Sequence, residues 1–295
     1  MKIAIIGMGL IGGSFYKAFL KAEQEVAGFD RDDPVDVTEA DIVIVATHPR
    51  TAIEVITAHA GEFKDGAIVV DTCGIKKPIM EAVAPLAKGA RWRFCGGHPM
   101  AGKEYSGFRN SDPALFSGAS MILVPGEGID DEALALLEDL FRQVGFKRMV
   151  LAEAARHDEM IAYTSQLCHI VSSAFLRDEL APSHEGFSAG SFRDMIRVGA
   201  PDPYLWSELF LDNSAALMPV LNRFIGRLTA MRDAIAANDR DAIWTQLSEG
   251  RPIKAQLASG SGKGHWTSAM KRKEPRPTAT LPKSADGGEE WVVPS

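Results

Sequence analysis

The stretch KIAIIGMGLIGG at residues 2–13 decides the fold of the first half of this chain. Its apolar run predicts a buried strand, and the G-x-G-x-x-G pattern that follows leads into a segment at 14–22 with helical character. The first glycine permits a tight turn, the second lets the backbone approach a pyrophosphate, and the third allows close packing of helix on strand. Amides at the helix N-terminus then hold the phosphates. The predicted cofactor residues of this turn are Gly7, Gly9, Leu10, Ile11 and Gly12.

Further apolar runs with the length of strands recur through the first half of the chain. They lie at 3–6, 25–29, 41–46, 67–70, 93–95 and 120–124. Near-continuous apolar runs are typical of a parallel sheet covered on both faces, and the periodicity at 130–144 predicts an amphipathic helix. Together they predict a doubly wound, Rossmann-like α/β domain at residues 1–150. Only about ten residues separate Asp30 from the next strand, fewer than a crossover usually needs, so we expect the second crossover helix to be missing.

After about residue 150 the strand signal gives way to helical periodicity. Helices are expected at 157–180, 202–238 and 239–258. Pro219 is expected to kink or split the second of them, because proline lacks the amide of an interior helical turn. The excess of apolar positions predicts a homodimer formed through an all-helical domain at 151–258. Residues 259–295, rich in Gly, Ser, Lys and Pro, predict a disordered tail.

Composition excludes several classes of function. The net charge of -7 and the pI near 5.6 make a nucleic-acid partner unexpected, and the basic run at 271–273 is interpreted as a solvated cluster. Three widely spaced cysteines without a CxxC pair argue against a disulfide framework and a metal site, and favour a reducing cytoplasm. The sequence shows neither a signal-peptide pattern nor an apolar run of about 18 residues, so no membrane association is expected.

A second motif, GGHPMAG at residues 96–102, surrounds one imidazole with constrained residues. Glycines and a proline around His98 predict a turn that presents the ring rather than burying it. The alternative is a structural histidine in a loop between strand and helix. The dinucleotide pattern upstream favours a chemical role, in which the histidine holds a substrate hydroxyl and helps to deprotonate it during hydride transfer.

The second strand ends in a residue that bears on the choice of cofactor. Asp30 follows Gly12 by about 18 residues, where a carboxylate accepts hydrogen bonds from the adenosine ribose and repels a 2′-phosphate. This favours NAD. Arg31 could instead stack on adenine or pair with a 2′-phosphate, so NADP remains the alternative. Thr47 is included in the predicted cofactor set.

Candidate substrate-binding residues lie in the helical half. Arg193 and Arg197 are four residues apart, so both guanidinium groups leave one face of a helical turn, which suits a dicarboxylate. The alternative is a surface salt-bridge cluster with Asp194 and Glu185. His169 lies on the first long helix, where its pattern fits a functional role and core packing equally well.

The combination of these motifs resembles the prephenate/arogenate dehydrogenase family of tyrosine biosynthesis. The segments that carry the resemblance are 7–13, 71–76, 97–102, 157–158, 165–169 and 192–197, with Asp202, Pro203 and Trp206. They span residues 1–258 in the order of the family.

The resemblance implies an NAD-dependent oxidative decarboxylation of prephenate to 4-hydroxyphenylpyruvate by a homodimer. In that family His98 matches the catalytic histidine, which binds the ring hydroxyl and draws its proton as the hydride leaves. His169 matches a second active-site histidine, and Arg197 matches the arginine that binds a substrate carboxylate. Arg193 and Asp194 match positions at the mouth of the pocket.

Some features depart from the family pattern and leave alternatives open. Gly74 stands where the family commonly has a serine, and Gln166 where it often has a histidine. A non-catalytic dinucleotide-binding regulator is therefore one alternative. Arogenate dehydrogenase is another, with Glu104 as a candidate acceptor for the ammonium group of arogenate. A hydroxyacid dehydrogenase is disfavoured, because its base would be a helix-borne lysine.

Overall fold

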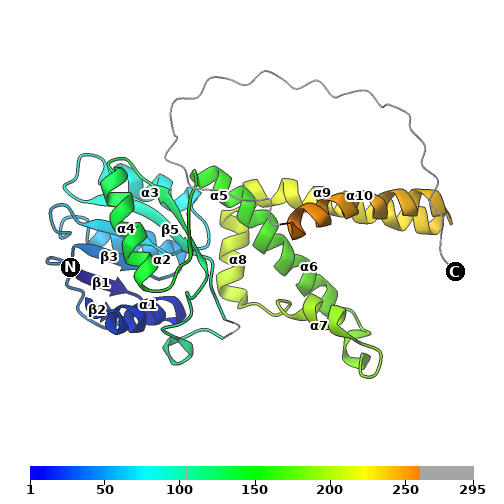
Figure 1. Cartoon of the computed structure of the whole chain (residues 1–295), viewed down its shortest axis with the longest axis horizontal. Coiled ribbons are helices and arrows are strands. Elements are labelled where there is room, and N and C mark those ends of the chain that lie inside the picture. Colours follow the sequence, from blue (N-terminus) through cyan, green and yellow to red (C-terminus); the bar gives the residue numbers. More distant parts are fainter. Residues whose placement is uncertain (104, 260–295) are drawn as a thin grey trace, which may run out of the picture.

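Residues 1–103 and 105–259 are described by a computed structural model, in which a sheet-containing half is followed by a helical half (Figure 1). The predicted disordered tail lies outside the described residues from 260 onward. In the described part, no helix is both long enough and apolar enough to cross a membrane.

The described residues of the first half form a seven-stranded sheet of order β2-β1-β3-β4-β5-β6-β7. Its strands are β1 Lys2–Ile6, β2 Glu25–Phe29, β3 Ile42–Val45, β4 Ile68–Asp71, β5 Arg93–Pro99, β6 Ser120–Pro125 and β7 Arg148–Leu151. The six predicted strands are confirmed. β7 was missed because it begins with an exposed arginine and only one of its four residues is buried, so it lacks the continuous apolar run of β3 and β4. The predicted parallel pairing holds from β1 to β5, whereas β6 runs antiparallel to β5, and β7 parallel to β6.

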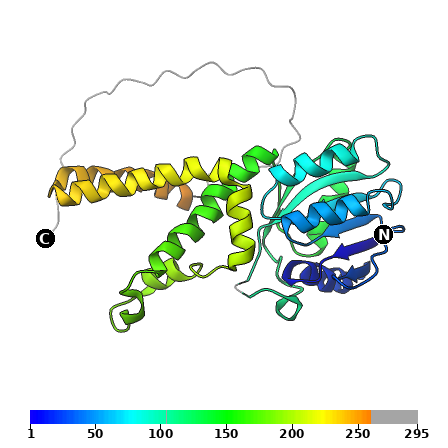
Figure 2. The same cartoon turned by 180° about the vertical axis from the view of Figure 1, so that it is seen from behind.

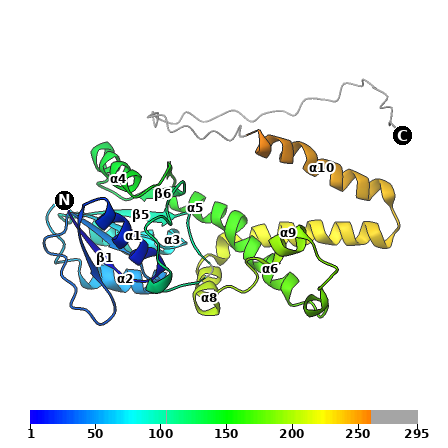
Figure 3. The ribbon, with the colours of Figure 1, turned by 60° about the horizontal axis from the view of Figure 1, so that its bottom comes forward.

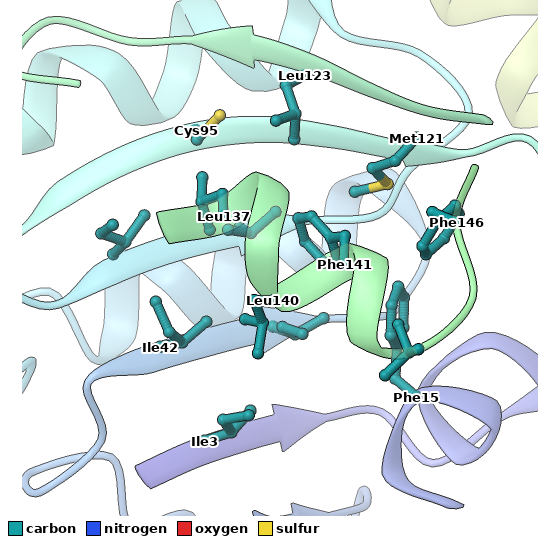
Figure 4. Close-up of a cluster of buried hydrophobic side chains, with 14 of the residues drawn as sticks. Ile3, Phe15, Ile42, Cys95, Met121, Leu123, Leu137, Leu140, Phe141 and Phe146 are labelled. Carbon is teal, nitrogen blue, oxygen red and sulfur yellow. The ribbon is translucent and has the colours of Figure 1, made fainter. Parts of the chain in front are cut away.

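Helices cover both faces of the sheet (Figure 2). They are α1 Leu10–Lys21, α2 Pro49–Ala58, α3 Lys77–Ala87 and α4 Asp131–Gln143, and a short 3-10 turn lies at Phe108–Asn110. Side chains of α1 and α4 pack on one face around Phe15 and Phe141, as Figure 4 shows, and those of α2 and α3 pack on the other. The predicted doubly wound architecture is therefore confirmed.

The connection between β2 and β3 contains no helix among its residues, all of which the structure describes. The predicted loss of the second crossover helix is thus confirmed. The short segment still carries the chain across β1, because β3 pairs with the opposite edge of β1 from β2. Buried Val37 and Ala40 fill part of the space on that face of the sheet.

The second half is helical, as predicted. Its elements are α5 Ala154–Ile161, a π-helical turn Ala162–Gln166, α6 Leu167–Leu176, a 3-10 turn Ala181–Ser183, α7 Gly190–Ile196, α8 Pro203–Asp212, α9 Ser214–Ala236 and α10 Arg240–Ala258. The predicted split at Pro219 is wrong, since this proline lies inside α9 and the chain breaks at Asn213. The buried Asn213 side chain donates to the carbonyl of Asp158 and to Oε1 of Gln166, contacts that favour a break there.

The two last helices, α9 and α10, extend away from the sheet as a long pair (Figure 3). They carry large apolar side chains that are exposed, namely Met218, Ile225, Leu228, Ile235, Trp244, Leu247, Ile253 and Leu257. Large apolar side chains exposed in this number on one pair of helices are typical of an interaction surface.

The aromatic cluster around Phe15 predicts that loss of a buried ring will lower the stability of the sheet-containing half. Phe15 is fully buried and its ring centroid lies 4.2 Å from that of Phe116. Phe15→Ala is expected to lower the free energy of unfolding by about 3–5 kcal/mol, because a buried cavity is left behind. Denaturant unfolding followed by circular dichroism measures the change. The control Phe187→Ala, at a side chain that is 95% exposed, should stay within about 0.5 kcal/mol of wild type, and equal effects would contradict this account.

Candidate active site

The carboxyl ends of the parallel strands meet at the edge of the sheet that faces the helical half (Figure 1). In open α/β sheets, ligands bind at this edge. Helix α8 lies against the start of α2 there, where the amide of Arg50 donates to Oε1 of Glu208 at 3.1 Å. The guanidinium of Arg50 also lies 3.4 Å from Asp212. The candidate site therefore lies where the two halves of the chain are in contact.

The glycine turn has the shape that a dinucleotide needs. Gly7 has a φ of +94°, and a Cβ there would lie 2.6 Å from the carbonyl oxygen of Ala46. A Cβ on Gly12 would lie 1.9 Å from the carbonyl oxygen of Gly7, so α1 and β1 could not pack as they do. A Cβ on Gly9 would meet nothing within 4 Å, which leaves the backbone open to an approaching pyrophosphate. No side chain caps the first turn of α1, where Leu10 and Ile11 lie.

The other predicted cofactor residues lie beside this turn. Asp30 follows β2 directly and is exposed, and the amide of Gly7 donates to the carbonyl of Phe29 at 2.8 Å. Arg31 is exposed next to it. Thr47 follows β3, and its methyl carbon lies 2.7 Å from the place of a Cβ on Gly7. The structure thus brings the predicted cofactor residues together at one edge of the sheet.

His98 lies in β5, opposite Ile122 of β6, so the predicted glycine-proline turn is wrong. The glycines before it serve close packing instead. A Cβ on Gly97 would lie 2.4 Å from the carbonyl oxygen of Asp71, and one on Gly96 would lie 3.0 Å from Cδ of Lys76. The ring of His98 is half-buried at the carboxyl end of its strand.

A chain of hydrogen bonds fixes the protonation of His98. Nδ1 of His157 donates to Oδ1 of Asp158 at 2.7 Å, because an ionised carboxylate only accepts. Amides of Lys76 and Lys77 also donate to this carboxylate, at 2.7 and 2.8 Å. Nε2 of the neutral His157 then accepts from Nδ1 of His98 at 2.9 Å. This assignment leaves Nε2 of His98 without a proton, as a hydrogen-bond acceptor and base.

Electrostatics keep both rings neutral. Burial lowers the pKa of His98 well below its usual value, and the repulsion that would arise if both imidazoles were charged, together with the charge of Lys76, lowers it further. Burial also lowers the pKa of His157, against the opposing effect of its hydrogen bond to Asp158. His98 is therefore neutral at pH 7, which is the form in which its Nε2 can act as an acceptor.

His169 belongs to a separate group of contacts on α6. Its Nδ1 donates to the carbonyl of Val198 at 3.0 Å, which leaves Nε2 as an acceptor, and its ring centroid lies 3.6 Å from that of Trp206. Burial lowers its pKa, and the charge of Arg197 lowers it further. In the described part of the chain, no hydrogen bond or ring contact joins His169 to His98.

The predicted arginines are exposed around α7. Arg197 follows the end of this helix and lines, with Asp194, a cavity of about 820 Å³ between α6, α7 and α9. Arg193 is not among the residues that line this cavity, and its pairing with Arg197 on one substrate stays a prediction. The cavity lies entirely within the helical half and does not include His98. Glu104 lies outside the described residues.

The sequence interpretation assigned no role to four buried residues that surround His98. They are Asp71, Lys76, His157 and Asp158. The sequence did contain a signal for these residues. Asp71 and Lys76 are the first and last residues of segment 71–76, and His157 and Asp158 form segment 157–158, both of which carry the family resemblance. In the described residues, no cluster of His, Cys, Asp or Glu is arranged to hold a metal ion.

The two departures from the family pattern have different structural settings. A Cβ on Gly74 would meet only the side chain of Leu209, at 3.5 Å, so there is room for a serine. Gln166 is buried in the helical half, where its Nε2 donates to the carbonyl of Leu209 and its Oε1 accepts from Asn213. Gln166 thus joins the π-helical turn to α8 and to the start of α9.

Known families and proteins match nearly the whole of the described part of the chain. The family described as "Prephenate dehydrogenase, nucleotide-binding domain" matches residues 16–150, and that described as "Prephenate dehydrogenase, dimerization domain" matches residues 153–249. A cyclohexadienyl dehydrogenase of Zymomonas mobilis is 33% identical over 87% of this chain and 95% of its own length. A prephenate dehydrogenase of Lactococcus lactis is 29% identical over 88% of this chain and 78% of its own length.

A solved structure shares the fold. Prephenate dehydrogenase from Aquifex aeolicus, in complex with hydroxyphenyl propionate and NAD+, covers 87% of this chain and 98% of its own. Its TM-score is 0.73 at 23% identity.

The neutral histidines predict how stability depends on pH. His98, His157 and His169 have lowered pKa values in the folded chain, whereas the unfolded chain binds these protons near the usual 6.5. The unfolded state therefore takes up more protons as the pH falls, and the free energy of unfolding decreases by up to about 1.4 kcal/mol per pH unit for each group. Stability should be full above about pH 7 and fall towards pH 5.

Urea unfolding between these pH values measures this dependence. His157→Gln should make it weaker, because one of the three groups is removed. A free energy of unfolding that does not change over this interval would contradict the assignment of neutral rings.

Proposed function

The chain belongs to the prephenate dehydrogenase family, and we propose that it converts prephenate to 4-hydroxyphenylpyruvate and carbon dioxide with NAD+ as the oxidant. As a member of this family it is a dehydrogenase with a nucleotide-binding and a dimerisation domain. We propose boundaries for these domains at 1–150 and 151–258. The choice of substrate and of cofactor goes beyond the family and rests on the residues below.

The observation that carries the proposal is the hydrogen-bonded chain from Asp158 through His157 to His98. It leaves Nε2 of His98 as the acceptor for the ring hydroxyl of the substrate. His98 takes the hydroxyl proton as the carbinol carbon loses its hydride and becomes a carbonyl. The bond from the ring to its carboxylate then breaks, the ring becomes aromatic, and His98 returns the proton to the new phenol oxygen. A non-catalytic regulator would not need this series of hydrogen bonds from Asp158 to His98.

The proposed cofactor is NAD. The open space at Gly9 and the narrow turn between Gly7 and Gly12 fit a pyrophosphate on the N-terminus of α1. Bound NAD+ supplies the hydride acceptor. Asp30, exposed beside the turn, accepts hydrogen bonds from the adenosine ribose and disfavours a 2′-phosphate. Arg31 makes NADP the alternative that a direct comparison of the two cofactors tests.

Prephenate is the proposed substrate, and arogenate is the alternative. Arg197 offers a guanidinium for a substrate carboxylate, and its positive charge helps to lower the pKa of His169. His169 presents its free Nε2 as a second polar contact. The relative from Lactococcus lactis is named a prephenate dehydrogenase, which favours the keto acid.

We also propose that the active protein is a homodimer. The exposed apolar side chains of α9 and α10 lie largely in the part that matches the dimerisation domain. A second copy would cover them. The expected cytoplasmic location follows from the family's place in biosynthesis and is likewise a proposal.

His98→Asn tests the catalytic assignment. Loss of the base is expected to lower kcat with prephenate and NAD+ by about 10²- to 10⁴-fold, measured by the absorbance of NADH. The control His59→Asn changes a histidine at the far end of α2, where it contacts Glu62, and should leave kcat unchanged. Near-normal turnover by His98→Asn would show that another group accepts the proton.

Arg197→Met tests the substrate assignment. Loss of a charged hydrogen bond to a carboxylate is expected to raise KM for prephenate by about 10- to 100-fold and to leave KM for NAD+ unchanged. Arg232→Met, at an exposed arginine paired with Asp233, is the matched control. An unaltered KM for prephenate in Arg197→Met would assign the carboxylate to another residue.

A further inference from the structure

We propose that Lys76 is the positioning residue of this site, because it closes a ring of contacts that holds His98 by its backbone and by its side chain at once. The inference rests on the proposed role of His98 as the base. No motif or family match above assigns a function to this lysine.

One arm of the ring reaches the backbone of His98. The ammonium group of Lys76 donates to Oδ2 of Asp71, at the end of β4. Oδ1 of the same carboxylate accepts the amide of Gly97 at 3.2 Å, and Gly97 directly precedes His98 in β5. The ion pair therefore sets the position of the strand at the catalytic residue.

The other arm reaches the ring of His98. The backbone amide of Lys76 donates to Oδ1 of Asp158 at 2.7 Å, and the same oxygen accepts Nδ1 of His157. Nε2 of His157 in turn contacts Nδ1 of His98 at 2.9 Å. Asp158 and His157 belong to α5, so this arm crosses from the sheet-containing half to the helical half. A single residue thereby ties the imidazole to both halves.

The burial of Lys76 argues against stability as the reason for a lysine at this position. The side chains of Lys76 and Asp71 are both fully buried. Removing two charges from water costs several kcal/mol for each ion, and a hydrophobic pair of similar volume is often at least as stable. A methionine would fill the space of the lysine stem, but it could not donate to Asp71. The ion pair therefore serves the geometry and the electrostatics of the site.

The charge of Lys76 also acts on the two imidazoles. It lowers the pKa of His98 and that of His157. The titratable groups that face this pair of rings are Lys76 before α3, Asp71 at the end of β4 and Asp158 on α5. Burial is the main cause of the lowered pKa of His98, and the positive charge of Lys76 adds to it, so removal of that charge should raise the pKa of His98.

The experiment compares wild type with Lys76→Met and with the double variant Asp71→Asn/Lys76→Met. The double variant leaves no unpaired buried carboxylate, so it carries the test if the single variant does not fold. We expect kcat to fall by about 10- to 100-fold, as small misplacements of catalytic groups do, with KM for NAD+ unchanged. The acidic limb of the kcat profile should move to higher pH. Lys88→Met, at an exposed lysine after the end of α3, is the control and should change neither.

A second readout does not depend on activity. NMR titration of the imidazole of His98, assigned with His98→Asn, should show a higher pKa in the double variant than in wild type. An unchanged kcat, acidic limb and titration in the double variant would overturn the role of Lys76. If wild type does not turn over prephenate, the proposed function fails, and the titration alone then decides the inference on Lys76.

Discussion

The carboxylate of Asp158 is the contact on which the site depends. It accepts hydrogen bonds from two backbone amides at the start of α3 and from Nδ1 of His157. One side chain of α5 therefore binds the sheet-containing half and at the same time orients His157, the partner of His98. Because both oxygens are used by donors, the tautomer of His157 is fixed, and with it the tautomer of His98. The same carboxylate thus determines both how the two halves of the chain are held together and which nitrogen of His98 carries the proton.

Local patterns in the sequence predicted most of the fold. The strands from β1 to β6, the glycine turn and the missing crossover helix all follow from residues within about fifteen positions of one another. The failures have a common cause. Gly96 and Gly97 predict a turn when read locally, yet they lie in β5 because Asp71 and Lys76 approach them from other elements. The break at Asn213 likewise depends on contacts with Asp158 and Gln166, which no local pattern contains.

The candidate site was predictable in its residue types but not in its connections. Resemblance and motif pointed to His98, and cofactor residues around Gly7 could be placed from the strand-turn-helix pattern alone. The partner of His98 lies 59 positions away, and the carboxylate that accepts the backbone amide of Lys76 lies 82 positions away. Such partners become visible only when the packing of α5 on the carboxyl edge of the sheet is known. Arg193 and Arg197 are four residues apart in the sequence, and of the two only Arg197 lines the cavity between α6, α7 and α9.

The glycine at position 74 is the departure from the family that this arrangement explains best. The space beside Leu209 would admit the serine that the family commonly has there. In this chain Nδ1 of His98 is already engaged by His157, which Asp158 holds in turn. The ring therefore needs no hydroxyl at position 74 to fix its orientation, and only its Nε2 must meet the substrate. A site of this design depends on the integrity of buried charges behind the base, because the groups that orient the imidazole lie on its protein side.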